Sequence, residues 1–290
     1  MAATQCEQEG DVARAMSIHA RIARFDPDPA VRARIAEMQL RAGQRTQGAE
    51  TWDVVAREEL RLGRVAHALA AARAALTAEP TPARRMLVAD TAQHAGQLEL
   101  TCEQLQLLAI DELAAGRHAR AQALCLRALR LLPTHVPTLR VAMDAFLRGR
   151  DAHRAVEAIR ALLRIDRDDR VAIEGVAEVF ALIGKKDRAA EVVKLLALRL
   201  SDDGLRDDAR ALVRRAITWR PGDATLTELQ QQLDARTPVP KVMAESTRVL
   251  DLGDLIQMAP PRAPTPPPVA AVPKHRAPPP LPGTGGWATR

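Results

Sequence analysis

The stretch GRHARAQALCLRALRLLP, residues 116–133, contains the pattern from which most of this chain is built. It begins with a glycine and ends with a proline seventeen residues later, and Ala and Leu dominate between them. Glycine accepts the positive φ of a tight turn after a helix, whereas proline cannot continue a helix. The stretch therefore predicts one helix between two breaks. The same spacing recurs in three further stretches, Gly10–Pro27, Gly63–Pro80 and Gly204–Pro221.

Small and apolar residues recur at fixed distances from the turns. The fifth residue after each turn is small: Ala15, Gly48, Ala68, Thr101, Ala121, Ala155, Ala189 and Ala209. The seventh residue before a turn is also small: Ala36, Ala56, Ala89, Ala109, Ala177 and Ala197. The twelfth residue after each turn is apolar: Ile22, Val55, Ala75, Leu108, Ala128, Leu162, Leu196 and Ala216. Small side chains let antiparallel helices approach closely, so these offsets predict helix pairs that stack on one another.

The spacing of the turns predicts a second kind of helix. The turns fall at Gly10, Gly43, Gly63, Gly96, Gly116, Arg150, Gly184 and Gly204. Successive intervals are 33, 20, 33, 20, 34, 34 and 20 residues. An interval of 20 leaves room for one helix of about 17 residues, roughly 25 Å long, which must belong to two successive pairs. We expect such shared helices at 45–62, 98–115 and 186–203.

The two ends of the array are expected to differ from its middle. Nine residues precede Gly10, so the N-terminal repeat is expected to be incomplete. Residues 223–234 are expected to form a closing helix, with Asp223 or Thr225 as its N-cap.

Composition agrees with an all-α fold and divides the chain in two. The 290 residues are 47% hydrophobic but only 2% aromatic, so the core must be built from Ala, Leu, Val and Ile. That composition disfavours a β-sandwich or barrel, and no apolar run reaches the about 18 residues of a membrane span. Thirteen of the twenty prolines follow residue 237. We expect a helical domain at 1–237 and a disordered Pro/Ala-rich tail at 238–290.

The repeats resemble the tetratricopeptide repeat family. Its 34-residue unit has small residues in the first helix, a glycine turn, two alanines in the second helix and a terminal proline. Residues 116–133 match this pattern, as does GRVAHALAAARAALTAEP from Gly63, and the resemblance covers roughly residues 3–235. It implies an α-solenoid of stacked antiparallel helix pairs with about 13 helices. The family's Trp and Tyr positions are filled here mainly by aliphatic or polar residues.

The resemblance also implies a function and a binding groove. Family members bind peptides through positions on the first helix of each pair. Here the candidate groove residues are Glu37, Arg57, Asp90, Arg140, Asp144, Glu174 and Glu178. The alternative is that these residues form an ordinary solvated face. The family's clamp for acidic chaperone tails needs asparagine, which this chain lacks, so a basic or mixed partner segment is expected instead.

Other chemistries find no support in the sequence. There is no Gly-rich phosphate loop, no metal-ligand spacing among His and Cys, and no nucleophile motif, so we expect no enzyme, cofactor, metal or small-molecule substrate. The net charge of +6 divides equally between body and tail, which disfavours nucleic-acid binding. Three cysteines without a secretion signal indicate a reducing, cytoplasmic compartment, with Cys102 and Cys125 as small core residues. Only 5 of the 42 basic residues are Lys, and we expect a bacterial-type protein.

One apolar island interrupts the tail. In TRVLDLGDLIQM, residues 247–258, the apolar side chains Val249, Leu250, Leu252, Leu255 and Ile256 recur near helical period. The island is either a docking segment, for a partner or for the chain's own groove, or an extension of the last helix. The sequence thus predicts a protein-binding adaptor or scaffold. The alternative is a regulatory or accessory subunit of a secretion, motility or signalling machine, tethered through its tail.

Overall fold

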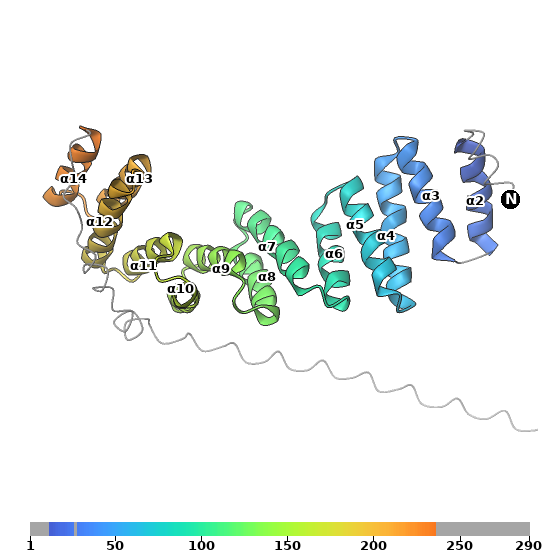
Figure 1. Cartoon of the computed structure of the whole chain (residues 1–290), viewed down its shortest axis with the longest axis horizontal. Coiled ribbons are helices and arrows are strands. Elements are labelled where there is room, and N and C mark those ends of the chain that lie inside the picture. Colours follow the sequence, from blue (N-terminus) through green and yellow to red (C-terminus); the bar gives the residue numbers. More distant parts are fainter. Residues whose placement is uncertain (1–11, 26–27, 236–290) are drawn as a thin grey trace, which may run out of the picture. The chain divides into compact units, whose positions relative to one another are not determined.

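The computed structural model describes residues 12–25 and 28–235, and all regular structure in these ranges is helical. Figure 1 shows the helices in chain order, each lying beside the next. The thirteen described helices are α2 (Val12–Phe25), α3 (Pro29–Arg41), α4 (Arg45–Arg61), α5 (Val65–Ala78), α6 (Pro82–His94), α7 (Leu98–Ala114), α8 (His118–Leu131), α9 (Val136–Arg148), α10 (Ala152–Ile165), α11 (Arg170–Leu182), α12 (Lys186–Asp202), α13 (Arg206–Trp219) and α14 (Ala224–Asp234). The expected α-solenoid of stacked helix pairs is confirmed.

The three shared helices are present at the expected places. α4, α7 and α12 each have 17 residues, whereas the other described helices have 11 to 14. Each ends one residue before the expected boundary, because that last residue serves as the C-cap. An interval of 20 residues between turns therefore corresponds to one long helix, as the spacing predicted.

Contacts between helices that are two elements apart show which role each shared helix has in the pair that follows it. We call a helix "first" when a turn residue follows its C-terminal end, and "second" when it starts directly after a turn residue. α4 contacts α6, α7 contacts α9, α9 contacts α11, and α12 contacts α14. The helix skipped in each case, α5, α8, α10 or α13, is a second helix only. The shared helices thus act as first helices toward the pair that follows them.

The turns have the left-handed geometry that their glycines predicted. Gly116 has φ of 72°; its N–H donates to Leu113 O, and the N–H of Arg117 donates to Glu112 O. This pair of hydrogen bonds is the Schellman motif, which uses the last free carbonyls of a helix. It recurs after Gly43, Gly63, Gly96, Gly184 and Gly204. Arg150 takes the same role with φ of 58°, the one positive φ outside glycine among the described residues.

The core is packed from small residues at the predicted offsets. All six of the small residues seven before a turn have no exposed surface. The small residues five after a turn are also all buried. A Cβ on Gly48 would lie 2.6 Å from Leu40 Cδ2, which shows how closely α3 and α4 approach. Small residues therefore set the spacing between helices.

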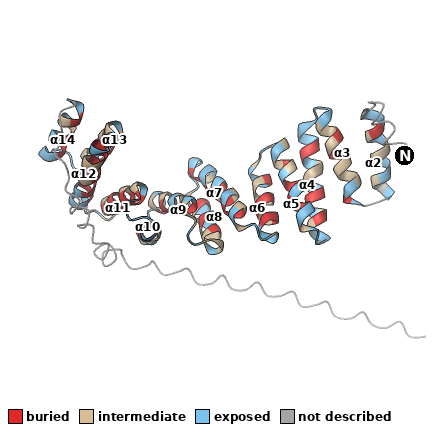
Figure 2. Ribbon diagram, in the orientation of Figure 1, coloured by how far each residue is buried: buried red, intermediate tan, exposed pale blue. Residues whose placement is uncertain are grey.

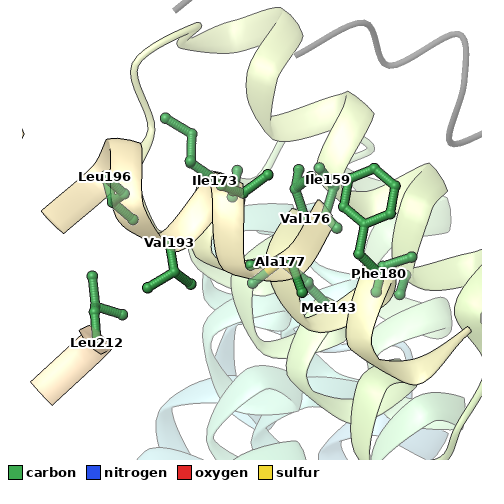
Figure 3. Close-up of a cluster of buried hydrophobic side chains, with 14 of the residues drawn as sticks. Met143, Ile159, Ile173, Val176, Ala177, Phe180, Val193, Leu196 and Leu212 are labelled. Atoms are coloured by element: carbon green, nitrogen blue, oxygen red, sulfur yellow. The ribbon is translucent and has the colours of Figure 1, made fainter. Parts of the chain in front are cut away.

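The buried side chains form one large cluster and three small ones. The large cluster extends from Ala109 in α7 to Leu233 in α14. Figure 3 shows part of it, where Val176 and Phe180 of α11 lie near Met143 of α9, and Val193 of α12 lies to their left. The three smaller clusters lie among α2 to α8. Figure 2 shows the buried residues, in red, along the helices of the array.

The expected closing helix is also present. Asp223 is its N-cap and accepts a hydrogen bond from the Thr225 N–H at 2.9 Å. Leu226, Leu229 and Leu233 are buried on one side of α14, whereas Gln231 and Glu228 are exposed. The described array thus ends on a helix with one polar face, as is usual for a capping element.

Candidate protein-binding face

Four first helices carry an acidic residue at the same position. Glu37, Asp90, Asp144 and Glu178 lie on α3, α6, α9 and α11, each six residues before the turn residue. Each of the four side chains is roughly one third to two fifths exposed. The equivalent positions thus form a series of carboxylates along the first helices.

Each of these carboxylates has an arginine partner. Glu37 accepts a hydrogen bond from Arg34, and Asp144 accepts one from Arg148, each at 2.8 Å and within one helix. Asp90 pairs with Arg127 of α8 at 2.7 Å. Glu178 pairs with Arg215 of α13 at 2.8 Å. Both of these longer pairs cross from a first helix to a second helix two elements later.

Arginines also balance the two carboxylates of α11, Glu174 and Glu178. Glu174 accepts a hydrogen bond from Arg170 Nε at 2.9 Å, and Arg215 lies near both Glu174 and Glu178. Arg170 also pairs with Asp208 of α13 at 2.8 Å. A basic ligand at this place would have to replace ion pairs that already join α11 to α13.

Two of the predicted residues line an open hollow between α7 and α9. Arg140 and Asp144 of α9 lie there with Val141 and Arg148. The α7 side is formed by Ile110, Leu113 and Ala114. Ile110 is 41% exposed, and Leu107, on the same helix, is 39% exposed. An apolar floor with charged side chains at its edge is the usual composition of a surface that binds a protein segment.

Hydrogen bonds fix the charged edge of this hollow. Arg140 Nη2 donates to Asp169 Oδ2 at 2.8 Å, and Asp169, which is buried, caps α11 by accepting from the Ala172 N–H at 2.9 Å. The hydrogen bond to Asp144 raises the pKa of Arg148, and the charge of Glu178 adds to the effect. Arg148 thus stays charged at physiological pH, and ion pairs hold both Arg140 and Arg148 in place.

The remaining predicted residues lie elsewhere on the array. Glu37 and Arg57 are on α3 and α4, Asp90 is on α6, and Glu174 and Glu178 are on α11. Sequence reasoning missed Ile110 and Leu113 because it did not apply the first-helix register to α7. Ile110 follows Ala109, as Asp144 follows Met143, so the turn spacing contained the signal. The docking segment 247–258 lies outside the described residues.

The two described cysteines are unsuited to nucleophilic chemistry. Cys102 and Cys125 are free thiols without exposed surface. Burial raises the pKa of Cys125 to about 12 and also raises that of Cys102. Both thiols therefore stay protonated at neutral pH, which agrees with their expected role as small core residues.

The described residues contain neither a cluster of metal ligands nor a membrane-spanning helix. Within residues 12–25 and 28–235, no three His, Cys, Asp or Glu side chains are grouped so that they could hold a metal ion. The described helices also include none with the length and apolar character needed to cross a bilayer.

The likenesses of this chain to known proteins are distant. No family model and no curated protein matches the chain. Similar solved structures include a tetratricopeptide repeat protein from Parabacteroides merdae, which is 14% identical with a TM-score of 0.32 and covers 80% of this chain and 96% of that one. The P58(IPK) TPR domain is 13% identical with a TM-score of 0.31, covering 88% and 81%.

A third structure is YrrB, described as a TPR protein with an unusual peptide-binding site. It is 10% identical with a TM-score of 0.29 and covers 69% of this chain and 99% of its own. These values are too low for any one of these proteins to define a site here. The chain's own helix pairs, its turn intervals of 33, 34 and 20 residues, and its left-handed turns give it a tetratricopeptide-type fold.

Proposed function

We propose that this chain is a non-enzymatic adaptor or scaffold that binds a segment of a partner protein in the hollow between α7 and α9. The observation that carries this proposal is the exposed side chain of Ile110, which lines the hollow together with Val141. Arg140, Asp144 and Arg148 lie at the edge of the same hollow. Apolar side chains of the partner would cover Ile110 and Val141, since burial of apolar surface is the main favourable term in association.

The charges around the hollow define the chemistry of the partner. Arg140 and Arg148 are about half exposed, while their carboxylate partners are less so. Part of each guanidinium is therefore open to a second acceptor, and arginine offers several donors. We propose a partner segment of mixed character, with apolar residues flanked by at least one carboxylate. Binding of this kind requires no covalent step.

The experiment is a comparison of three full-length proteins. Partners are first captured from the native cell with the wild-type chain, and the affinity of each purified partner is then measured for two variants. Ile110→Asp should weaken binding at least about tenfold, since it places a charge in the apolar floor. Ile165→Asp changes an equally exposed residue on α10 and should have no effect. Equal affinity of Ile110→Asp and wild type would refute this site.

A second comparison tests the neighbouring acidic residues. Charge reversal of Glu174 and Glu178 should leave binding unchanged if the hollow between α7 and α9 is the whole site. A loss of binding with retained helicity would instead extend the site to α11. Circular dichroism separates this result from misfolding, because both residues pair with arginines of the array.

A further inference from the structure

An apolar face of α2 is left uncovered at the N-terminal end of the described array. A shallow hollow runs along α2, lined by Arg14, Ser17, Ile18, Arg21, Ile22 and Phe25. Ile22 is 38% exposed and Phe25 is 90% exposed. The other seven residues at the Ile22 position, twelve after a turn residue, are at most 5% exposed. α2 thus has the pattern of a second helix, but Ile22 and Phe25 on its packing surface are exposed, whereas Ile18 packs against a small cluster with Met38 of α3.

The same face in α8 shows what normally covers it. Residues eight, twelve and fifteen after the turn are Leu124, Ala128 and Leu131 in α8, and Ile18, Ile22 and Phe25 in α2. The α8 residues form a cluster with Met86 and Ala89 of α6 and with Cys102 and Leu105 of α7. The covering surface therefore comes from a first helix and the helix that follows it.

A charge accompanies this apolar face. Arg127 of α8 and Arg215 of α13 both stand eleven residues after a turn, and each pairs with the position-matched acid of a first helix, Asp90 or Glu178. Arg21 holds this position in α2 and is exposed. A segment that binds this face of α2 should therefore present apolar side chains and an acidic residue. In α6 and α11 that acidic residue directly follows a small one, Ala89 or Ala177.

The tail contains that pattern. In the docking segment 247–258, Gly253 is followed by Asp254, as Ala89 is followed by Asp90 and Ala177 by Glu178. The positions one before and two and three after the small residue are Leu252, Leu255 and Ile256. In α6, α9 and α11 the same three positions are buried in every case. The segment thus has the sequence pattern of a first helix separated from the array.

We propose that the docking segment of one copy binds the open face of α2 in a second copy, with Asp254 beside Arg21. Eleven residues separate the segment from the last described residue, a reach of at most about 40 Å. Eleven helices lie between α14 and α2, and neighbouring helices pack about 8–10 Å apart. The tail of one copy would have to pass along the whole array to reach α2 of the same copy. When the tail binds α2 of a second copy, this is not needed.

Direct stacking of array ends is a poorer match to the open face. α14 carries its buried leucines on one side and exposed polar residues elsewhere. The contact between the docking segment and α2 joins two different surfaces. Two copies that exchange both tails form a closed dimer, and copies that bind one after another form an open assembly. This self-association uses surfaces other than the hollow between α7 and α9.

Sedimentation of the full chain over a range of concentrations tests the proposal. Wild type should associate as concentration rises, whereas Ile22→Asp and the double variant Leu252→Asp, Leu255→Asp should stay monomeric. Ile165→Asp is the control and should associate like wild type, since it changes another exposed apolar residue. Circular dichroism should show unchanged helicity in all four proteins, because Ile22 and Ile165 are exposed.

Mixing the two monomeric variants distinguishes exchange from folding back. Ile22→Asp retains an intact tail, and the double variant retains an intact α2 face, so the mixture should form a heterodimer. Reversing both charges, Arg21→Asp with Asp254→Arg, should restore association that either change alone weakens. A wild type that is monomeric at all concentrations, or a mixture that does not associate, would overturn the proposal.

Discussion

The backbone of Arg150 is strained at a position where every other described repeat turn has glycine. Its φ of 58° is left-handed, a conformation that costs a residue with a Cβ about 1–2 kcal/mol. The helix end it serves is otherwise the same, since its N–H donates to Leu147 O and that of Asp151 to Phe146 O. The hydrogen bonds of the turn thus hold the arginine in this conformation.

We therefore predict opposite effects at two equivalent turns. Arg150→Gly should raise the free energy of unfolding by roughly 0.5–1 kcal/mol, because relief of strain exceeds the added freedom of the unfolded chain. Gly116→Ala should lower it by about 1 kcal/mol, since a Cβ at Gly116 would contact nothing and only the backbone is strained. Urea unfolding measures both. A neutral Gly116→Ala would contradict the left-handed turn.

At the scale of the helix, packing depends on the small residues that face a neighbour. Ala121 of α8 has no exposed surface and belongs to the large cluster. Ala121→Leu should cost about 1–3 kcal/mol, because extra methylenes force α8 away from its neighbours. Thermal or urea unfolding of the purified variant gives this value.

Arg73→Leu is the control for that change. Arg73 lies on the exposed side of α5 and donates a hydrogen bond to Gln97 at 3.1 Å. Removing an exposed hydrogen bond changes stability little, so the variant should unfold within about 0.5 kcal/mol of wild type. Equal losses for Ala121→Leu and Arg73→Leu would mean that the repeat register is wrong.

The shared helices could be predicted from sequence because turn spacing alone fixes them. Two left-handed turns 20 residues apart, with no proline between, leave a single helix as the solution, and α4, α7 and α12 confirm it. Buried small residues were predictable for the same reason.

Ion pairs between helices could not be predicted in this way. Whether Arg127 reaches Asp90, 37 residues earlier, depends on how α6, α7 and α8 stack. The spacing of residues along one helix does not show which residue of another helix a long side chain reaches. The sequence therefore gives no sign that Arg215 of α13 lies beside Glu174 and Glu178 and balances their charge.

For the whole molecule, the division of the core predicts uneven stability. The large cluster joins α7 to α14, whereas the helices before α7 share only small clusters. In a repeat array each helix is stabilised mainly by its neighbours, so local opening follows local burial. Trp52 packs against a small cluster and Trp219 against the large one, which places one probe in each region.

We predict that the region around Trp52 unfolds at a lower urea concentration than the region around Trp219. Fluorescence of two variants measures this, one keeping only Trp52 and the other only Trp219, each with Trp287→Phe. Leu212→Ala removes a buried side chain of α13 from the large cluster and should lower the free energy of unfolding by about 2–5 kcal/mol. It should lower the urea midpoint reported by Trp219 more than the midpoint reported by Trp52. Coincident midpoints that shift together would show instead that the array unfolds as one cooperative unit.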